Sequence, residues 1–185
     1  MSTLRQSFIN ELEDLYDAEN QLLKALPKMA EAAENDELKA AFRDHEGQTR
    51  EQIKRLGKVF EVFGETPKRK KCKGMAGLIA EGEDLIQEEE GDAALIGAAQ
   101  KAEHYEISAY GTLAAWATAL QEQNAVSLLQ ETLAEETETD EKLTSIAESV
   151  VNEEEIEGEE SEDTESEEKE TKPNRKAPVA ASTAK

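Results

Sequence analysis

The spacing of apolar residues along the first 152 residues predicts four long helices. In the first helix these residues recur in alternating steps of four and three, from Phe8 through Leu15 and Leu22 to Met29. This period gives a helix one apolar face, and no stretch alternates convincingly as a half-buried strand would. The four predicted helices span residues 2–34, 37–63, 93–121 and 125–151.

The connections between these helices predict how they are arranged. A short turn at Asn35 joins the first helix to the second, and Asn35 caps the second helix. Another short turn, at 122–124, joins the third helix to the fourth. Residues 64–91, with a short helix at about 75–89, form a connection long enough to cross the bundle, and Asp92 is expected to cap the third helix. We therefore predict an all-α fold, a ferritin-like four-helix bundle with one long crossover containing a short helix.

Polar residues interrupt the apolar stripe in the middle of each helix. Glu19 and Gln52 each lie about 16 residues from the first short turn. Glu106 and Asp140 each lie 17 from the second. Because a helix rises about 1.5 Å per residue, these positions should share one layer of the bundle. The interruptions are Glu19 on the first helix, His45, Gln48 or Thr49, and Gln52 on the second, Glu103 and Glu106 on the third, and Glu136 and Asp140 on the fourth.

Five carboxylates inside an apolar core would cost several kcal/mol each if they had no partner. One or two divalent ions would resolve this conflict, and iron and manganese accept both carboxylate oxygen and imidazole nitrogen. The candidate metal ligands are Glu19, His45, Glu103, Glu106, Glu136 and Asp140. The alternative is a structural polar layer, in which the carboxylates bond to Thr49, Gln52, Tyr16 and Tyr110 and set the register of the helices.

The net charge of −22 is unevenly distributed along the chain. Residues 153–185 hold twelve acidic and five basic residues, and their large apolar residues are only Ile156 and Val179. Such a stretch buries too little surface to offset the entropy of ordering. We therefore expect two parts, a bundle over residues 1–152 and a disordered acidic tail over 153–185. The tail either keeps the protein in solution or binds a basic partner.

A basic stretch over residues 68–73 stands out in this acidic chain and surrounds Cys72, the one cysteine. It is either a solvated loop, paired with the acidic tail, or a local site for an anion or partner. Neighbouring cations would favour the Cys72 thiolate and make it redox-sensitive, whereas a buried cysteine at the start of a turn would be inert.

Composition excludes several classes of protein. The acidic charge disfavours nucleic acid as a partner, because phosphates would be repelled. No apolar run reaches the roughly 18 residues of a membrane span, and the N-terminus lacks the pattern of a signal peptide. A single cysteine permits no intrachain disulfide. These features lead us to expect a cytoplasmic protein without membrane or nucleic-acid partners.

The sequence also resembles the YciE/YciF stress-protein family of ferritin-like domains (DUF892). The resemblance lies in ELEDLYDAENQLLKALPKMAEAA (11–33), LKAAFRDHEGQTREQIKRLGKVFEVFG (38–64), CKGMAGLIAEG (72–82), AAQKAEHYEISAYGTLAAWA (98–117) and LLQETLAEETETDEKLTSIA (128–147). It implies a fold similar to that of dimetal carboxylate proteins, an association with stress responses, and a homodimer. The family often has Glu where this chain has Gln48.

Three functions remain open from the sequence. The first is a stress-associated protein whose di-iron or di-manganese centre reacts with peroxide or oxygen. The second is a non-catalytic stress or interaction protein with a structural polar layer, which Gln48 and Thr139 favour because a ligand Glu and His would otherwise stand there. The third is iron storage, which would need a cage of many copies. Charge disfavours a mini-ferritin that coats DNA.

Overall fold

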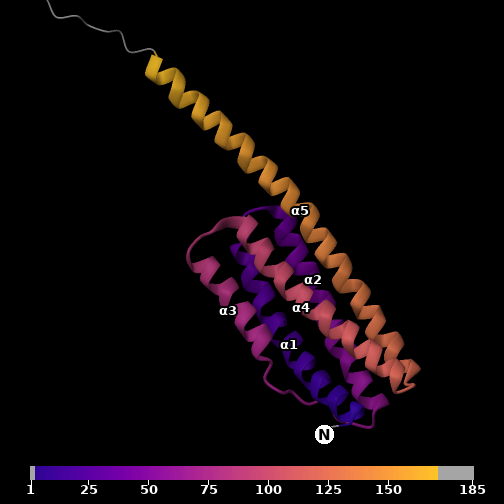
Figure 1. Ribbon diagram of the computed structural model, residues 1–185. Helices are drawn as coiled ribbons and strands as arrows, with labels where there is room; N and C mark the ends of the chain where they lie inside the picture. Colours follow the sequence, from indigo (N-terminus) through magenta and orange to yellow (C-terminus); the bar gives the residue numbers. More distant parts are fainter. Residues whose placement is uncertain (1–2, 171–185) are drawn as a thin grey trace, which may run out of the picture. The chain divides into compact units, whose positions relative to one another are not determined.

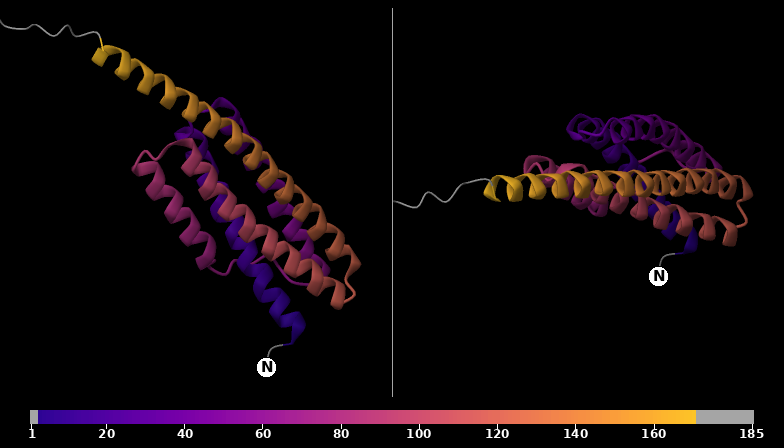
Figure 2. Two further views of the ribbon diagram at one scale, coloured as in Figure 1. Left: turned by 45° about the horizontal axis from the view of Figure 1, so that its top comes forward. Right: turned by 90° about the horizontal axis from the view of Figure 1, so that it is seen from above.

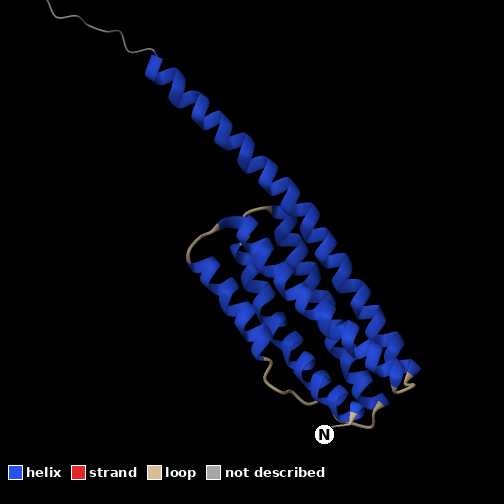
Figure 3. Ribbon diagram, viewed as in Figure 1, coloured by secondary structure: helices blue, strands red, loops and turns tan. Residues whose placement is uncertain are grey.

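The computed structural model describes residues 3–170, with side chains from 3 to 149. This part of the chain forms helices joined by loops and contains no strand (Figure 1, Figure 3). Its helices are α1 (Leu4–Ala32), α2 (Asp36–Val62), α3 (Lys73–Gln87), α4 (Gly91–Ala119) and α5 (Gln123–Glu170). The predicted all-α fold, with a short helix inside the long crossover, is confirmed.

The chain divides into two units, Met1–Val150 and Val151–Lys185. The first contains α1 to α4 and the beginning of α5, and the second contains the rest of α5 to Glu170. The tail predicted to be disordered begins at residue 153. Its first part, residues 153–170, is helical, in line with the high helix propensity of its many glutamates. Its remainder, residues 171–185, lies outside the described residues.

Within the first unit, α1 is the central contact partner of the helices. It packs against α2, α3 and α4, and α3 also packs against α4. Figure 1 and Figure 2 show α3 lying along α1 and α4, on the side away from α5. Phe8 of α1 stacks on Phe63 just after α2, with ring centroids 4.3 Å apart. The apolar stripes read from the sequence form this core, which includes Leu12, Leu15, Leu22, Leu26, Leu38, Phe42, Leu56, Leu95, Leu113 and Leu129.

The predicted cap of the second helix is confirmed, and that of the third is not. Thr3 accepts from the Gln6 amide, and the Asn35 side chain accepts from the amides of Glu37 and Leu38. Asp92 was predicted to cap the third helix, and this prediction is wrong. Its carboxylate instead accepts from the amides of Glu34, at 2.9 Å, and Asn35, at 2.6 Å. Asp92 therefore ties the α1–α2 turn to α4.

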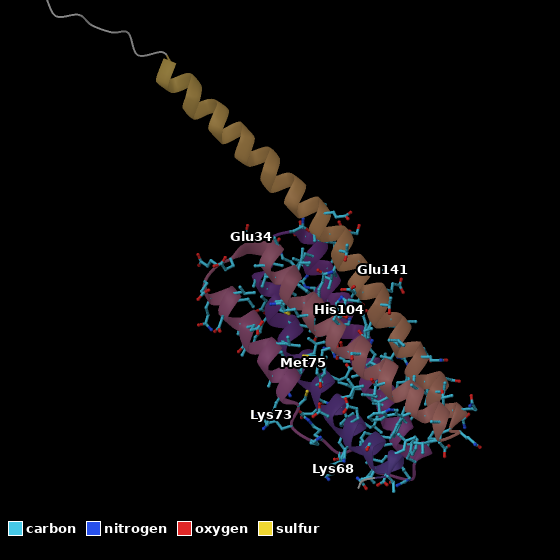
Figure 4. The ribbon with its side chains drawn as sticks, viewed as in Figure 1. Glu34, Lys68, Lys73, Met75, His104 and Glu141 are labelled. Atoms are coloured by element: carbon cyan, nitrogen blue, oxygen red, sulfur yellow. The ribbon has the colours of Figure 1, made fainter. Side chains whose placement is uncertain are left out.

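The basic stretch of the crossover pairs with acidic residues of α1. Arg69 Nε lies 2.7 Å from Asp17, and Lys68 Nζ lies 3.3 Å from Glu13. The Lys70 amide also donates to the Glu13 carbonyl at 3.1 Å. The stretch therefore fastens the crossover to α1 rather than lying free in solvent. Lys68 and Lys73 are labelled beside this connection in Figure 4.

Cys72 is fully buried and caps α3. Its sulfur accepts from the Met75 amide at 3.4 Å and lies 3.0 Å from the Tyr105 hydroxyl. The ring of Tyr105 packs so closely on Gly74 that a Cβ there would come within 2.7 Å of it. Burial raises the pKa of the Cys72 thiol above its usual value. The structure therefore favours the buried, inert cysteine over the redox-sensitive thiolate.

No helix in the described part of the chain combines the length and apolarity that a membrane span requires.

Replacing Asp92 by alanine should lower the free energy of unfolding by about 1–3 kcal/mol, because two amides of the α1–α2 turn lose their acceptor. Urea unfolding of the full chain measures this, with Asp84→Ala on the exposed face of α3 as control. Equal losses in the two variants would contradict an anchoring role for Asp92.

Native Cys72 should react with iodoacetamide at pH 8 at least about a hundredfold more slowly than Cys72 in the urea-unfolded chain, because it is buried and its thiolate is disfavoured. Mass spectrometry of the alkylated protein follows both rates. A native rate close to the unfolded rate would restore the reactive-thiolate interpretation.

Candidate metal centre

Four helices each bring acidic or basic side chains into one buried layer. Glu19 comes from α1, His45 from α2, Glu103 and Glu106 from α4, and Glu136 from α5. Each is at most 3% exposed. Glu103 and Glu106 both reach the layer because residues three apart share one face of a helix. These five residues, which the sequence placed within about one turn of a common height, are all buried.

Four of them form a compact cluster. One ligand atom from each of His45, Glu103, Glu106 and Glu136 can be chosen so that all four atoms lie within 4.8 Å of one another. His45 Nε2 lies 3.1 Å from Glu103 Oε1 and 3.9 Å from Glu136 Oε2. On its other side, His45 Nδ1 lies 3.3 Å from Gln48 Oε1. When Nδ1 carries the proton it donates to Gln48, which leaves the Nε2 lone pair facing the carboxylates.

The layer contains the unsatisfied polar atoms of the core. Within the described residues, eight buried side-chain nitrogen and oxygen atoms have no hydrogen-bond partner, and all eight belong to this layer. They are Glu19 Oε2, His45 Nε2, Gln52 Oε1, Glu103 Oε2, and both carboxylate oxygens of Glu106 and of Glu136. Unpaired buried carboxylate oxygens are costly, and a divalent cation accepts several at once. The residues present therefore fit a metal ion.

Protons are the alternative to a metal as a source of positive charge. Burial, together with neighbouring carboxylates, raises the pKa of Glu19 to about 7 and holds the pKa values of Glu106 and Glu136 well above their usual range. Burial opposes the charged form of His45, but Glu103 raises its pKa above the usual value. Without a metal, the layer therefore retains protons that carboxylates in water would have lost, and metal binding would release them.

Asp17, on the same helix as Glu19, is a buried acid whose carboxylate has hydrogen-bond partners. Its carboxylate accepts from Arg69 at 2.7 Å, from the Cys72 amide at 2.9 Å and from Gln21 at 2.6 Å. Burial opposes its charge, yet these bonds lower the pKa of Asp17 below the usual value. Asp17 lies only two residues from Glu19, so the difference between the two acids comes from their surroundings.

A purely structural polar layer would pair every buried carboxylate, and only some of the expected contacts form. Tyr110 donates to Glu19, and burial and the nearby carboxylates hold the pKa of the tyrosine well above its usual value. The Thr49 hydroxyl donates instead to the His45 carbonyl of its own helix, at 2.9 Å. Tyr16 packs edge to face on Phe60. These contacts leave Glu106 and Glu136 unsatisfied.

Asp140 and Glu19 lie outside the four-residue cluster. Asp140 is partly exposed and accepts from Gln100 at 3.2 Å, and it lies 3.4 Å from Nε2 of the exposed His104, labelled in Figure 4. Asp140 lies one helical turn, about 6 Å along α5, from Glu136, and its partners are Gln100 and His104 rather than the cluster. Glu19 is fully buried beside the cluster and is held by Tyr110.

Sequence reasoning missed a polar network between α2 and α5. Arg55 donates to Thr132 at 2.6 Å, to both oxygens of Glu135 at 2.9 Å, and to Glu131 at 2.8 Å. Gln52, on the same helix face, donates to Glu135 at 3.1 Å. The signal in the sequence was the pair Glu131 and Glu135, four residues apart on α5. This network holds α5, and hence Glu136, against α2.

The comparisons with known proteins agree with this fold. The family described as "Domain of unknown function (DUF892)" matches residues 3–155. Protein YciF of Escherichia coli (strain K12) is 47% identical over 140 residues, which cover 73% of this chain and 84% of YciF. The crystal structure of that stress protein matches with a TM-score of 0.80 and 48% identity, over 82% of this chain and 99% of YciF.

Two further solved structures are similar. YcfI of Rhodopseudomonas palustris, provisionally described as a structural protein, has 39% identity and a TM-score of 0.75, over 77% of this chain and 94% of YcfI. A ferritin-like diiron-carboxylate protein of Bacillus anthracis str. Ames has 18% identity and a TM-score of 0.64, over 80% of this chain and 99% of that protein. The last likeness concerns the fold alone, which is ferritin-like. From the match over residues 3–155 and the identity to YciF, we conclude that the chain belongs to the DUF892 family.

Proposed function

We propose that this protein binds iron or manganese, as one or two ions, in its carboxylate layer and uses the centre in redox chemistry with peroxide or oxygen during stress. The observation that carries the proposal is the group of buried, unpartnered ligand atoms on His45, Glu103, Glu106 and Glu136. A core polar layer built only for stability would pair such atoms.

The donor set favours these metals over others. It combines one imidazole with several carboxylates and no thiolate, which suits iron or manganese better than soft-ligand metals. His45, Glu103, Glu106 and Glu136 would hold the first ion, and Glu19 would help to hold a second. When bound, the metal would supply electron transfer to a small oxidant.

The remaining groups of the site would keep the ligand side chains in position. Tyr110 holds one oxygen of Glu19, and Gln48 orients the ring of His45. Apolar residues pack around the layer in the core of the bundle. Arg55 braces α5 through Glu135, next to the ligand Glu136.

A non-catalytic role is the second candidate, and the raised carboxyl pKa values favour it. A layer that keeps its protons is neutral and can remain buried without an ion. Gln48, where the family often has Glu, also removes one charged ligand. The homodimer, the basic partner of the tail and the cytoplasmic location stay predictions.

Protein purified without chelator, or equilibrated anaerobically with Fe²⁺, should contain one to two ions of iron or manganese per chain by elemental analysis. Glu136→Gln should weaken binding at least about a hundredfold, because it removes a charged ligand. Asp140→Asn, a matched change one turn away, should leave the metal content unchanged, because Asp140 lies outside the cluster.

An absence of bound metal in the parent, or equal metal content in parent and Glu136→Gln, would contradict the metal centre. Peroxide consumption by the metal-loaded parent, compared with the metal-free form, then separates the redox function from a purely structural one.

The metal-free protein should lose stability as the pH rises from about 4.5 to above 7. In this range the folded state keeps a proton on Glu19, whose pKa is about 7, while the unfolded chain has lost it. The folded state therefore binds more protons, and each further pH unit disfavours it. Urea unfolding between pH 5 and pH 8 measures the slope.

Glu19→Gln should flatten this slope, because its amide needs no proton to be neutral, whereas the control Glu83→Gln on α3 should not. Equal slopes in all three proteins would show that Glu19 does not titrate as described.

A further inference from the structure

A pocket of about 140 Å³ lies between α2, α4 and α5 and ends at the carboxylate layer. Its wall includes His45 and Glu103 of the cluster, with Gln48 and Thr139 beside them. Space of this size holds several water molecules or a hydrated ion. Two other pockets, one bordered by α1, α3 and α4 and one near the start of α4, are lined by no residue of the layer.

The inner end of the pocket carries unsatisfied ligand atoms. His45 is 3% exposed and Glu103 is 2% exposed, and His45 Nε2 and Glu103 Oε2 have no hydrogen-bond partner. Both residues belong to the four-residue cluster. The pocket therefore reaches two residues that carry candidate ligand atoms.

The mouth of the pocket carries charged residues on α2 and α5. Asp44, Glu138 and Lys142 are exposed there, and Lys142 Nζ lies 3.5 Å from Asp44 Oδ2. The side chains of Lys142 and Asp44 are 44% and 73% exposed, so water competes for both partners and the ion pair is weak. With two acids at the mouth and Glu103 inside, the pocket attracts cations and repels anions.

We propose that this pocket is the access route by which a divalent cation reaches the layer, with Asp44 and Glu138 drawing it in and Lys142 as the displaceable group across the mouth. The proposal rests on the metal centre proposed above, and it assigns the cation's path to α2 and α5 rather than to the α3 side of the bundle. A route changes how fast a metal binds and leaves, whereas a ligand changes how tightly it binds.

Stopped-flow absorbance of Co²⁺ binding to the full-length, metal-free chain tests the route. The double variant Asp44→Asn, Glu138→Gln should bind Co²⁺ about tenfold more slowly at low ionic strength, and the difference should shrink in high salt. Lys142→Ala should bind faster, because it removes the positive charge at the mouth. The control Glu81→Gln, Glu83→Gln makes the same change of charge on α3 and should bind at the parental rate.

A third variant tests the space itself. Thr139→Phe should fill the pocket and slow both association and dissociation of Co²⁺ with little change in Kd, and circular dichroism confirms that it folds. The variants at the mouth change exposed residues and should fold. They therefore test the route even if Thr139→Phe does not fold. The route would be overturned, and the metal centre left intact, if the double variant at the mouth and Lys142→Ala both bound Co²⁺ at the parental rate with unchanged Kd. Failure of the parent itself to bind Co²⁺ at equilibrium would overturn the metal centre and the route together.

Discussion

The structure is constrained above all by the burial of four glutamates and one histidine in the middle of an apolar bundle. Carboxylates in such a place need positive charge, and among the buried residues that the structure describes only His45 can supply it. Two sources remain, protons bound by the glutamates or a cation shared among them. Burial raises the pKa values of Glu106 and Glu136, which favours the first, and their unpartnered oxygens favour the second. Binding of a metal in this core would therefore release protons.

The remaining polar contacts keep the helices in the register that this layer requires. Asp92 holds the α1–α2 turn against α4, and Asp17 holds the crossover against α1. Arg55 holds α5 against α2 beside Glu136. These three residues are satisfied by their partners, whereas the glutamates of the layer are not. The contrast separates the charges that build the bundle from those available to a ligand.

The apolar stripes and short turns were sufficient to predict the helices and their connectivity, because helical period and loop length are local properties of the chain. The height of the layer was also predicted, since the rise per residue is constant. Asp140 was grouped with the layer because counting along a helix does not show which side chains a residue contacts, and its partners Gln100 and His104 are known only from the fold. The role of Asp92 was predicted wrongly and the reactivity of Cys72 was left open. The reason is that their partners, Glu34 and Tyr105, are distant in sequence.

The sequence by itself determined that this chain forms an all-helical bundle with acids on its apolar faces, because each helix carries its own pattern of residues. Only the tertiary structure decided which acids meet, because that depends on the rotation and packing of helices far apart in the chain. It placed His45, Glu103, Glu106 and Glu136 within reach of one ion and turned Asp140 towards Gln100. Packing of the helices also leaves a pocket lined by residues of α2, α4 and α5, which no pattern within a single helix could predict.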